Sequence, residues 1–335
     1  MRPFRSHGVR IASSGAVAVA LLASACGTAA PAPSAAPSSG GAASPAATPS
    51  TPPSSSPSSA ASSTATGTIA FSSNRGGKSQ IYLMNADGSS LTRLTTDNVA
   101  EQRAEAWSPD RTKLLITSQD RGMAAVFVIN ADGSGQRRLT DTTFDASGPT
   151  WSPDGTRIAL HEDTSGHGCY QVFVMNADGS SPTKLTKEPD CNWGPRWSSD
   201  GEKLAFGTTR DGNFDIWTMN PDGTGQTLLE RNPPTNDAFP VFSPDGSKIL
   251  FTTWNGGLDA DSAEIAVMNA DGSGRHQLTT NGVEDLAGAW SPDGTRIAYQ
   301  SKRAGNFEIF VMNADGSDQT QLTHDPSDDA GPLWK

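Results

Sequence analysis

Acidic residues recur at one position of this sequence, shortly before a repeated tryptophan or phenylalanine. Carboxylates that converge in a fold can hold a cation or receive a Lys- or Arg-bearing segment of a protein partner. The alternative is that each Asp or Asn caps loop backbone, as these residue types do routinely. Six residues ahead of the aromatic positions stand Glu101, Asp145, Cys191, Asn236, Glu284 and Asp328, and the next position adds Asp237, Asp285 and Asp329.

Aromatic residues occur in the same variable segments of the chain. These are Phe144, Trp193, Phe239 and Trp254. Large rings at a surface can anchor a protein partner, or they can simply cover the edges of a sheet. The candidate partner-binding residues are therefore the carboxylates above and two of these aromatic residues: Glu101, Asp145, Asp237, Glu284, Asp285, Asp328, Asp329, Trp193 and Trp254. A glycan-binding module that uses the loop aromatics is the first alternative.

No motif in the sequence demands catalysis. The chain has no GxSxG elbow, no phosphate-cradling loop and no nucleophile with a His-Asp pair at a readable spacing. Its DG-S/T-G segments recur six times, where catalysis would need one. The sequence therefore favours a protein that is not an enzyme and that needs no cofactor, with a metal-dependent lyase or hydrolase as the second alternative.

Two phrases organise the rest of the chain. WSPDGTRIA stands at Trp151 and Trp290, with looser copies at Trp107, Trp197 and Phe242. In each copy Pro supplies the fixed φ of a turn, Gly reaches positive φ, and the residues that follow suit a buried strand. The second phrase is NADG or NPDG, preceded by an apolar run and followed in most copies by Leu-Thr; its copies begin at Asn85, Asn130, Asn176, Asn220, Asn269 and Asn313.

The spacing of these phrases predicts the fold. The second phrase steps by 45, 46, 44, 49 and 44 residues, and one step of 44 beyond Trp290 reaches Trp334. Four short strands in a period of roughly 40–45 residues are typical of a propeller blade. Residues 67–335 are therefore predicted to form an all-β, six-bladed β-propeller.

The first repeat lacks an inner strand of its own. The chain begins its first blade at Thr68 with IAFSS, which matches the second strand of the other repeats. We expect the segment 331–335 to supply the missing strand, so that the C-terminal strand pairs with the N-terminal blade and removes an exposed edge.

Strand alternation divides the loops between two faces of the ring. The SPDG and NADG turns share one face and barely vary, whereas the second-to-third and blade-to-blade loops share the other face and differ between copies. Function in repeat proteins tends to lie where the repeats vary. The blade-to-blade loops should bring the carboxylates named above to one mouth of the central channel.

Cys169 and Cys191 fall in loops on that variable face of one blade. In an oxidising compartment two such cysteines are expected to form a disulfide. A metal site is the alternative, because five possible ligands are near in sequence: His161, Glu162, Asp163, His167 and Asp190. The H-E-x-x-x-x-H spacing, however, matches no zinc motif. The acidic stretch 259–264 lacks the spacing of an EF-hand, so we expect a solvated loop there.

The repeat phrases W-S-P-D-G-T-R-I-A and V-M-N-A-D-G-S resemble those of the TolB-like propeller family over residues 68–335. The resemblance implies a six-bladed propeller exported to the cell envelope. In the Tol system such a propeller binds an envelope lipoprotein through its channel mouth. Related propellers precede hydrolase domains in dipeptidyl-peptidase-like enzymes, and an oligogalacturonate-lyase-like propeller needs a cluster of His metal ligands. The five His of this chain show no evident clustering.

The first residues resemble a bacterial lipoprotein leader. A basic start precedes the short apolar run 11–25, and the sequence ASAC resembles a lipobox, which predicts a signal peptide over 1–25 and lipidation of Cys26. A plain secretory signal and an uncleaved anchor are the alternatives. Residues 26–66, rich in Ala, Pro, Ser and Thr, are predicted to be a disordered tether.

The charge narrows the class of partner. The formal net charge is −11, and it becomes more negative once the basic leader is removed, which argues against nucleic acid and against an anionic membrane surface. We therefore expect an exported, lipid-anchored monomer of the cell envelope. It would bind a protein or peptide and contact the membrane only through its lipid.

Overall fold

A computed structural model describes residues 67–96, 100–120, 122–141, 143–187, 189–232, 234–255 and 262–335. The expected signal peptide, Cys26 and the tether of residues 26–66 lie outside these ranges, as do residues 259–261 of the acidic stretch. The expected solvated loop is wrong for Glu264, which begins a strand and is buried. Within the described ranges every regular element is a β-strand. No helix that is long and apolar enough to cross a membrane occurs in these ranges.

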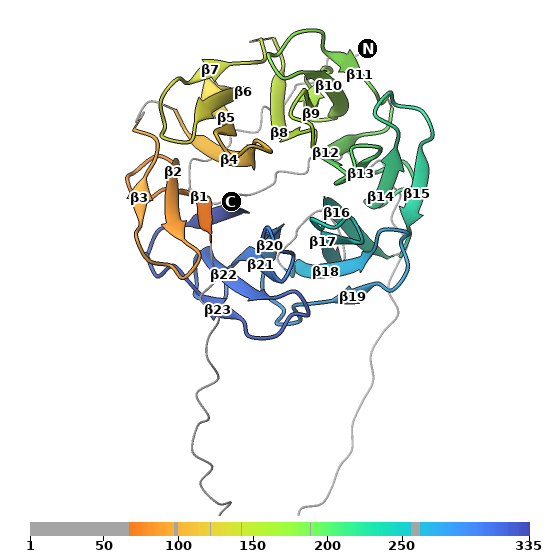
Figure 1. Cartoon of the computed structure of the whole chain (residues 1–335). Helices are drawn as coiled ribbons and strands as arrows, with labels where there is room; N and C mark the ends of the chain where they lie inside the picture. The colour runs from red at the N-terminus through yellow and green to blue at the C-terminus, as the bar shows by residue number, and fades with distance from the viewer. Residues whose placement is uncertain are drawn as a thin grey trace, which may run out of the picture. The chain divides into compact units, whose positions relative to one another are not determined.

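Six antiparallel sheets of four strands surround a central axis (Figure 1). The innermost strands are β4 (Gln102–Trp107), β8 (Asp145–Trp151), β12 (Asn192–Trp197), β16 (Thr235–Phe242), β20 (Asp285–Trp290) and β24 (Asp329–Trp334). The second strands are β1 (Thr68–Ser73), β5 (Lys113–Asp120), β9 (Arg157–Asp163), β13 (Leu204–Thr208), β17 (Lys248–Asn255) and β21 (Arg296–Ser301).

The third and fourth strands complete each blade toward the outside. The third strands are β2 (Gln80–Asn85), β6 (Met123–Asn130), β10 (Gln171–Asn176), β14 (Asp215–Met219), β18 (Glu264–Asn269) and β22 (Glu308–Asn313). The fourth are β3 (Thr92–Arg93), β7 (Arg137–Arg138), β11 (Thr183–Lys184), β15 (Thr227–Glu230), β19 (His276–Gln277) and β23 (Thr320–Gln321). Blade 1 contains β24 and β1–β3, and blades 2 to 6 follow in chain order from β4. The predicted six-bladed fold is confirmed.

The closure of the ring is also as predicted. Strand β24 pairs with β1, aligning Ile69 with Trp334 and Ala70 with Leu333, and the backbone N–H of Lys335 donates to the carbonyl of Thr68 at 2.7 Å. Trp334 is buried and packs with Ile69 and other residues of blades 1 and 6. Figure 1 shows the C-terminal end of the chain beside β1.

Hydrogen bonds within each repeated turn stabilise its conformation. In the WSPDG turn of blade 3, Gly155 has φ +72° and its N–H donates to Ser152 O at 2.9 Å. The Asp154 carboxylate accepts from the Ser152 hydroxyl at 2.5 Å and from the Thr156 N–H at 3.0 Å. Pro at the first corner and Gly at the positive φ are the residues that such a turn requires.

The hydrophobic core lies between neighbouring blades. Leu115 and Val126 of blade 2 pack against Ile158, Leu160 and Phe173 of blade 3, and all five are buried. Contacts of this kind repeat around the ring. Burying these side chains is the main source of stability, at roughly 25 cal/mol per Å² of apolar surface.

Candidate functional site

The two faces of the propeller differ in construction. Because the strands are antiparallel, the SPDG and NADG turns lie at one end of the blades, which we call the turn face. The second-to-third loops and the blade-to-blade loops lie at the other end, which we call the loop face. The candidate residues of the sequence belong to the loop face or to the inner strands that start there.

The turn face is a regular array of hydrogen-bonded aspartates. Hydroxyl and backbone N–H donors lower the pKa of each, to about 2 for Asp154 and Asp245. These groups act as turn supports. The pKa is likewise lowered for Asp87, Asp110, Asp132, Asp178, Asp200, Asp222, Asp271, Asp293 and Asp315.

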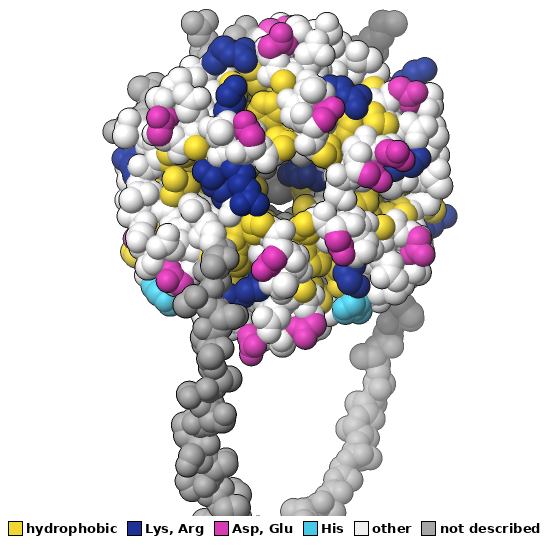
Figure 2. Space-filling model, viewed as in Figure 1, with side chains coloured by type: hydrophobic (Ala, Val, Ile, Leu, Met, Phe, Trp, Pro, Cys, Tyr) yellow, Lys and Arg dark blue, Asp and Glu magenta, His cyan; other side chains and the backbone are white. Residues whose placement is uncertain are grey.

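The turn face also has a pocket of about 400 Å³ between blades 2 and 3, which we did not anticipate from the sequence. Pro109, Lys113, Arg137, Trp151 and Asp178 are among its lining residues. Figure 2 shows a central opening with several Lys and Arg side chains at its rim and most Asp and Glu side chains farther out. The rim of the opening in this view is therefore not acidic.

On the loop face, three of the candidate residues act as caps that connect neighbouring blades. Asp145 accepts a hydrogen bond from the Ala124 N–H at 2.6 Å, Asn236 from Phe214 at 3.0 Å, and Asp328 from Phe307 at 3.0 Å. Each donor opens or precedes the third strand of the preceding blade. The capping alternative therefore describes these residues, although they cap the neighbouring blade. Asp145 and Asp328 remain half-buried.

The acidic residues at the next position are enclosed in the sheets. Asp237, Asp285 and Asp329 are each 0 % exposed. They accept from Arg275 at 2.9 Å, Arg303 at 3.1 Å and Arg75 at 2.5 Å, respectively. This differs from the expected open ring of carboxylates, because at this position the inner strand runs against the preceding blade and its side chain enters the joint between them.

The remaining acidic candidates are placed differently from one another. Glu284 is buried and forms an ion pair with Lys302. Glu101 is half-buried, and its backbone carbonyl accepts from the Gln119 N–H at 3.0 Å. The structure thus leaves Glu101, Asp145 and Asp328 as the candidate carboxylates with access to solvent.

Two of the aromatic candidates, Trp193 and Trp254, belong to a row of rings across blades 3 to 5, whose other members, Tyr170 and Phe214, were not candidates in the sequence. Ring centroids are 6.4 Å apart for Tyr170 and Trp193, 4.9 Å for Trp193 and Phe214, and 5.7 Å for Phe214 and Trp254. Trp193 is half-buried, whereas Trp254 is 3 % exposed. Trp193 is therefore available to a ligand, and Trp254 is part of the core. Phe144 and Phe239 are also half-buried.

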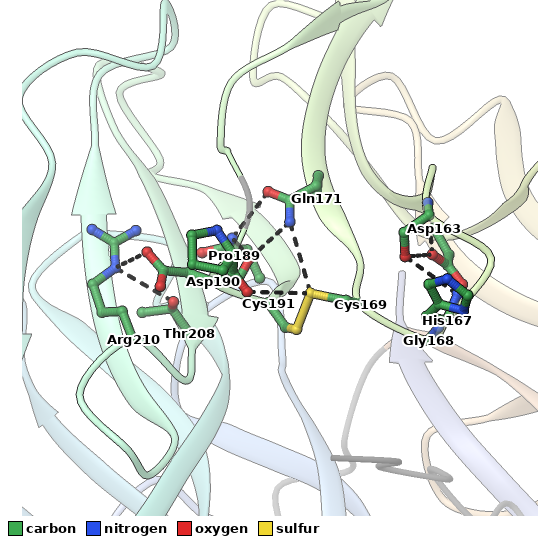
Figure 3. The surroundings of a disulfide bond; sticks show 12 residues. Asp163, His167, Gly168, Cys169, Gln171, Pro189, Asp190, Cys191, Thr208 and Arg210 are labelled. Atoms are coloured by element: carbon green, nitrogen blue, oxygen red, sulfur yellow. Dashed lines mark hydrogen bonds and ion pairs between the residues drawn. A yellow bond between two sulfur atoms is a disulfide. The ribbon is translucent and has the colours of Figure 1, made fainter. Parts of the chain in front are cut away.

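A disulfide joins Cys169 and Cys191 on the loop face (Figure 3). Beside it, the Gln171 side-chain amide donates to Asp190 O at 2.7 Å. Asp163, named above with the metal alternative, instead accepts from the backbone N–H groups of Gly166 at 2.9 Å and Gly168 at 2.7 Å. Among the described residues no group of three His, Cys, Asp or Glu side chains is arranged to hold a metal.

A polar cluster on the inner strands was missed in the sequence. Glu105 of β4 and Arg196 of β12 interact electrostatically, and burial raises the pKa of Glu105. Nearby, burial lowers the pKa of His161 to about 3. Its Nδ1 accepts from the Gly194 N–H at 3.3 Å, so its Nε2 donates to the Ser147 hydroxyl at 2.9 Å. This polarity is the reverse of that in a Ser-His nucleophile pair.

The family described as "TolB beta propeller domain" matches residues 99–284 and 240–335. The curated dipeptidyl-peptidase 5 of Porphyromonas gingivalis is 35% identical over 68 residues, which are 20% of this chain and 10% of that protein. The chain thus aligns with only a small part of that relative.

Solved structures share the fold at low sequence identity. TolB from Acinetobacter baumannii is 18% identical, with a TM-score of 0.70 over 80% of this chain and 66% of that one. An oligogalacturonate lyase in complex with manganese is 16% identical, with a TM-score of 0.53 over 76% of this chain and 73% of that one. At these identities the likeness shows the propeller fold alone.

Proposed function

Because this chain belongs to the TolB beta propeller domain family, we propose that it is a binding module of the bacterial cell envelope. It recognises a protein or peptide through the loop face and the adjacent channel mouth. The observation that carries this proposal is the contrast between the faces: the turns repeat with little change, while the loops differ in length and chemistry from blade to blade.

The contact residues of this proposal are those that keep access to solvent. Glu101, Asp145, Asp328 and Trp193 are half-buried around the loop face. Three carboxylates and one indole suit a partner segment with Lys or Arg beside an apolar anchor, because aromatic anchors supply affinity and rim charges supply steering. The enclosed candidates Asp237, Trp254, Glu284, Asp285 and Asp329 hold the loops in shape.

The location of the module follows from the leader in the sequence. We propose that residues 1–25 direct export, that Cys26 carries the lipid, and that residues 26–66 separate the propeller from the membrane. The module acts as a monomer and does not bind nucleic acid. Replacing Cys26 by Ala should move the protein from the membrane fraction to the soluble fraction; retention in the membrane would contradict the lipid anchor.

The partner is tested by pull-down from envelope extract with the propeller, residues 65–335. The informative variant is Glu101→Gln with Asp145→Asn and Asp328→Asn, because Asn keeps the capping oxygen, as Asn236 does naturally. Loss of three rim charges should weaken a cationic partner by about tenfold. Glu202→Gln on the turn face is the control. Equal capture by the triple variant and the parent would contradict the proposed surface.

A glycan-binding module is the second candidate, favoured by the aromatic row through Tyr170 and Trp193. Trp193→Ala should abolish glycan retention on immobilised cell-wall material, while the charge-neutral triple variant should retain it. Metal analysis of the purified protein, combined with peptidase and lyase assays, checks the enzymatic alternative suggested by the names of its relatives.

A further inference from the structure

The joints between successive blades bring two buried side chains to equivalent positions. The first side chain lies at the start of a blade's third strand; in blade 2 it is Ala125, inside β6. The second lies on the next blade's inner strand, five residues before the repeated Trp or Phe. The residues of every pair are buried. Around the ring the pairs are Gln80–Gln102, Ala125–Ala146, Gln171–Asn192, Asp215–Asp237, Glu264–Asp285 and Glu308–Asp329.

The joint between blades 3 and 4 shows how such a pair is satisfied by amides. The Asn192 side-chain N–H donates to Gln171 Oε1 at 3.2 Å. The same oxygen accepts from the Thr186 hydroxyl at 2.8 Å. The two positions are thus within hydrogen-bonding distance, and a donor lies between them. The Asn192 oxygen has no partner, but the amide pair carries no charge.

The three carboxyl joints have the same geometry without that donor. Asp237, Asp285 and Asp329 use the same backbone hydrogen bond to the preceding blade as Asn192, each N–H donating at 2.8–2.9 Å. Buried oxygens at these joints have no hydrogen-bond partner. Leaving such groups unsatisfied is costly. The atoms are Asp215 Oδ2, Asp237 Oδ2, Glu264 Oε2, Asp285 Oδ1 and Asp329 Oδ1.

We propose that each carboxyl joint binds one proton, shared between its two carboxyl groups. At two joints both carboxyl groups have an oxygen without a partner, Asp215 Oδ2 with Asp237 Oδ2 and Glu264 Oε2 with Asp285 Oδ1, and one shared proton would satisfy both oxygens. The proton takes the place of the Asn192 N–H. It also balances charge, because two carboxyls with one proton carry a single negative charge, and one arginine faces each pair.

The surrounding groups favour protonation of the member on the third strand. Burial raises the pKa of Asp215, Glu264 and Glu308; hydrogen bonds to their oxygens oppose this rise, and the negative charge of the paired Asp adds to it. Burial also raises the pKa of Asp329. The other charged groups near these pairs are Asp211 and Arg231 at Asp215, Arg303 at Glu264, and His324 at Glu308.

The shared protons make this half of the ring sensitive to alkali. A group whose folded-state pKa is raised stabilises the fold fully below its unfolded pKa, and that stabilisation is lost as pH rises through the folded pKa. When the proton leaves, two buried carboxylates face one arginine at each joint. Blades 4, 5, 6 and 1 therefore meet at titratable joints, whereas the three joints that involve blades 2 and 3 contain no carboxyl pair.

The test uses amide variants that supply the donor permanently. Asp215→Asn, Glu264→Gln and Glu308→Gln in the full chain should each raise the Tm by roughly 2–4 °C at pH 8 and by less at pH 5. Glu202→Gln, which removes one exposed charge on the turn face, is the matched control. Variants whose Tm is lower than that of the parent at both pH values, or whose dependence on pH is unchanged, would overturn the proposal.

A second measurement needs no variant. Infrared spectra of the parent protein at pH 7 should show the C=O stretch of protonated, buried carboxylic acids, and this band should weaken in each amide variant. If the spectrum contains ionised carboxylates only, the pairs are bridged by water or by an ion and the shared proton is excluded.

Discussion

The turn face and the loop face use the same kind of side chain in opposite ways. Carboxylates of the turn face are exposed, accept hydrogen bonds from Ser, Thr and backbone N–H groups, and have lowered pKa values. At the blade joints near the loop face, Asp215, Glu264, Glu308 and Asp329 are buried, and burial raises their pKa values. What an Asp or Glu does in this ring is therefore decided by access to water, since donors stabilise its charge and burial disfavours it.

Both faces depend on six complete blades, so removing the strand that completes blade 1 should have the largest effect on stability. Deleting residues 331–335 exposes the edge of β1 and removes the buried Trp334. We expect the cooperative thermal transition to be lost or to shift far downward. Trp334→Ala alone should cost about 3–5 kcal/mol. An unchanged melting curve, followed by circular dichroism, would contradict the closure.

Cutting the disulfide should affect one face and spare the other. Cys169 and Cys191 close a loop with a sequence separation of 22, for which the loss is about 3 kcal/mol. In Cys169→Ser with Cys191→Ser, amide hydrogen exchange should accelerate near Gln171 and Asn192 and stay unchanged near Gly155. The control is the denaturant midpoint measured with and without reductant. Reductant should lower the midpoint of the parent and leave that of the double variant unchanged. Uniform acceleration on both faces would mean that the faces are not independent.

Acid should destabilise the turn face, whereas the carboxyl joints should be destabilised by alkali. Because the pKa of Asp154 is lowered to about 2 from 3.8, its contribution is present above pH 4 and is lost as pH falls toward 2. Asp154→Ala should lower the Tm by about 2 °C at pH 7 and by less near pH 2. The same substitution at the exposed Glu202 is the control, and equal effects on the Tm would argue against a supporting role for the aspartate.

His161 should make stability depend on pH through the unfolded state. Because its pKa is lowered to about 3, the folded imidazole stays neutral above about pH 4, whereas the unfolded imidazole binds a proton below its ordinary pKa of 6.5. Stability should therefore fall as the pH drops from 7 to 5, and His161→Gln should reduce that dependence. NMR titration of the imidazole is the direct measurement. A midpoint near 6.5 would show that water reaches the ring.

The fold could be predicted because its signals are local. Pro109 and Gly155 each determine a turn within their own few residues, and the regular spacing of such turns gives the number of blades. The burial of Asp237, Asp285 and Asp329 could not be predicted in this way, because it depends on the preceding blade. Arg75, which pairs with Asp329, is 254 residues away from it.

The candidate site was predicted less completely for the same reason. Loops were assigned to the correct face by strand alternation, but alternation does not say whether Trp193 or Trp254 keeps access to solvent. Glu105 and Arg196 interact electrostatically although β4 and β12 belong to different blades, and no local signal in the sequence relates the two residues.

The pairing of β24 with β1 also constrains how the protein is made. Strand β24 comes last in the order of synthesis, so blade 1 waits with three strands until every other blade has emerged from the ribosome and any translocation channel. During that interval the edge of β1 can accept a strand from a second, equally unfinished molecule. We therefore expect domain-swapped dimers to be the characteristic assembly error of this chain, and they should accumulate when expression is high.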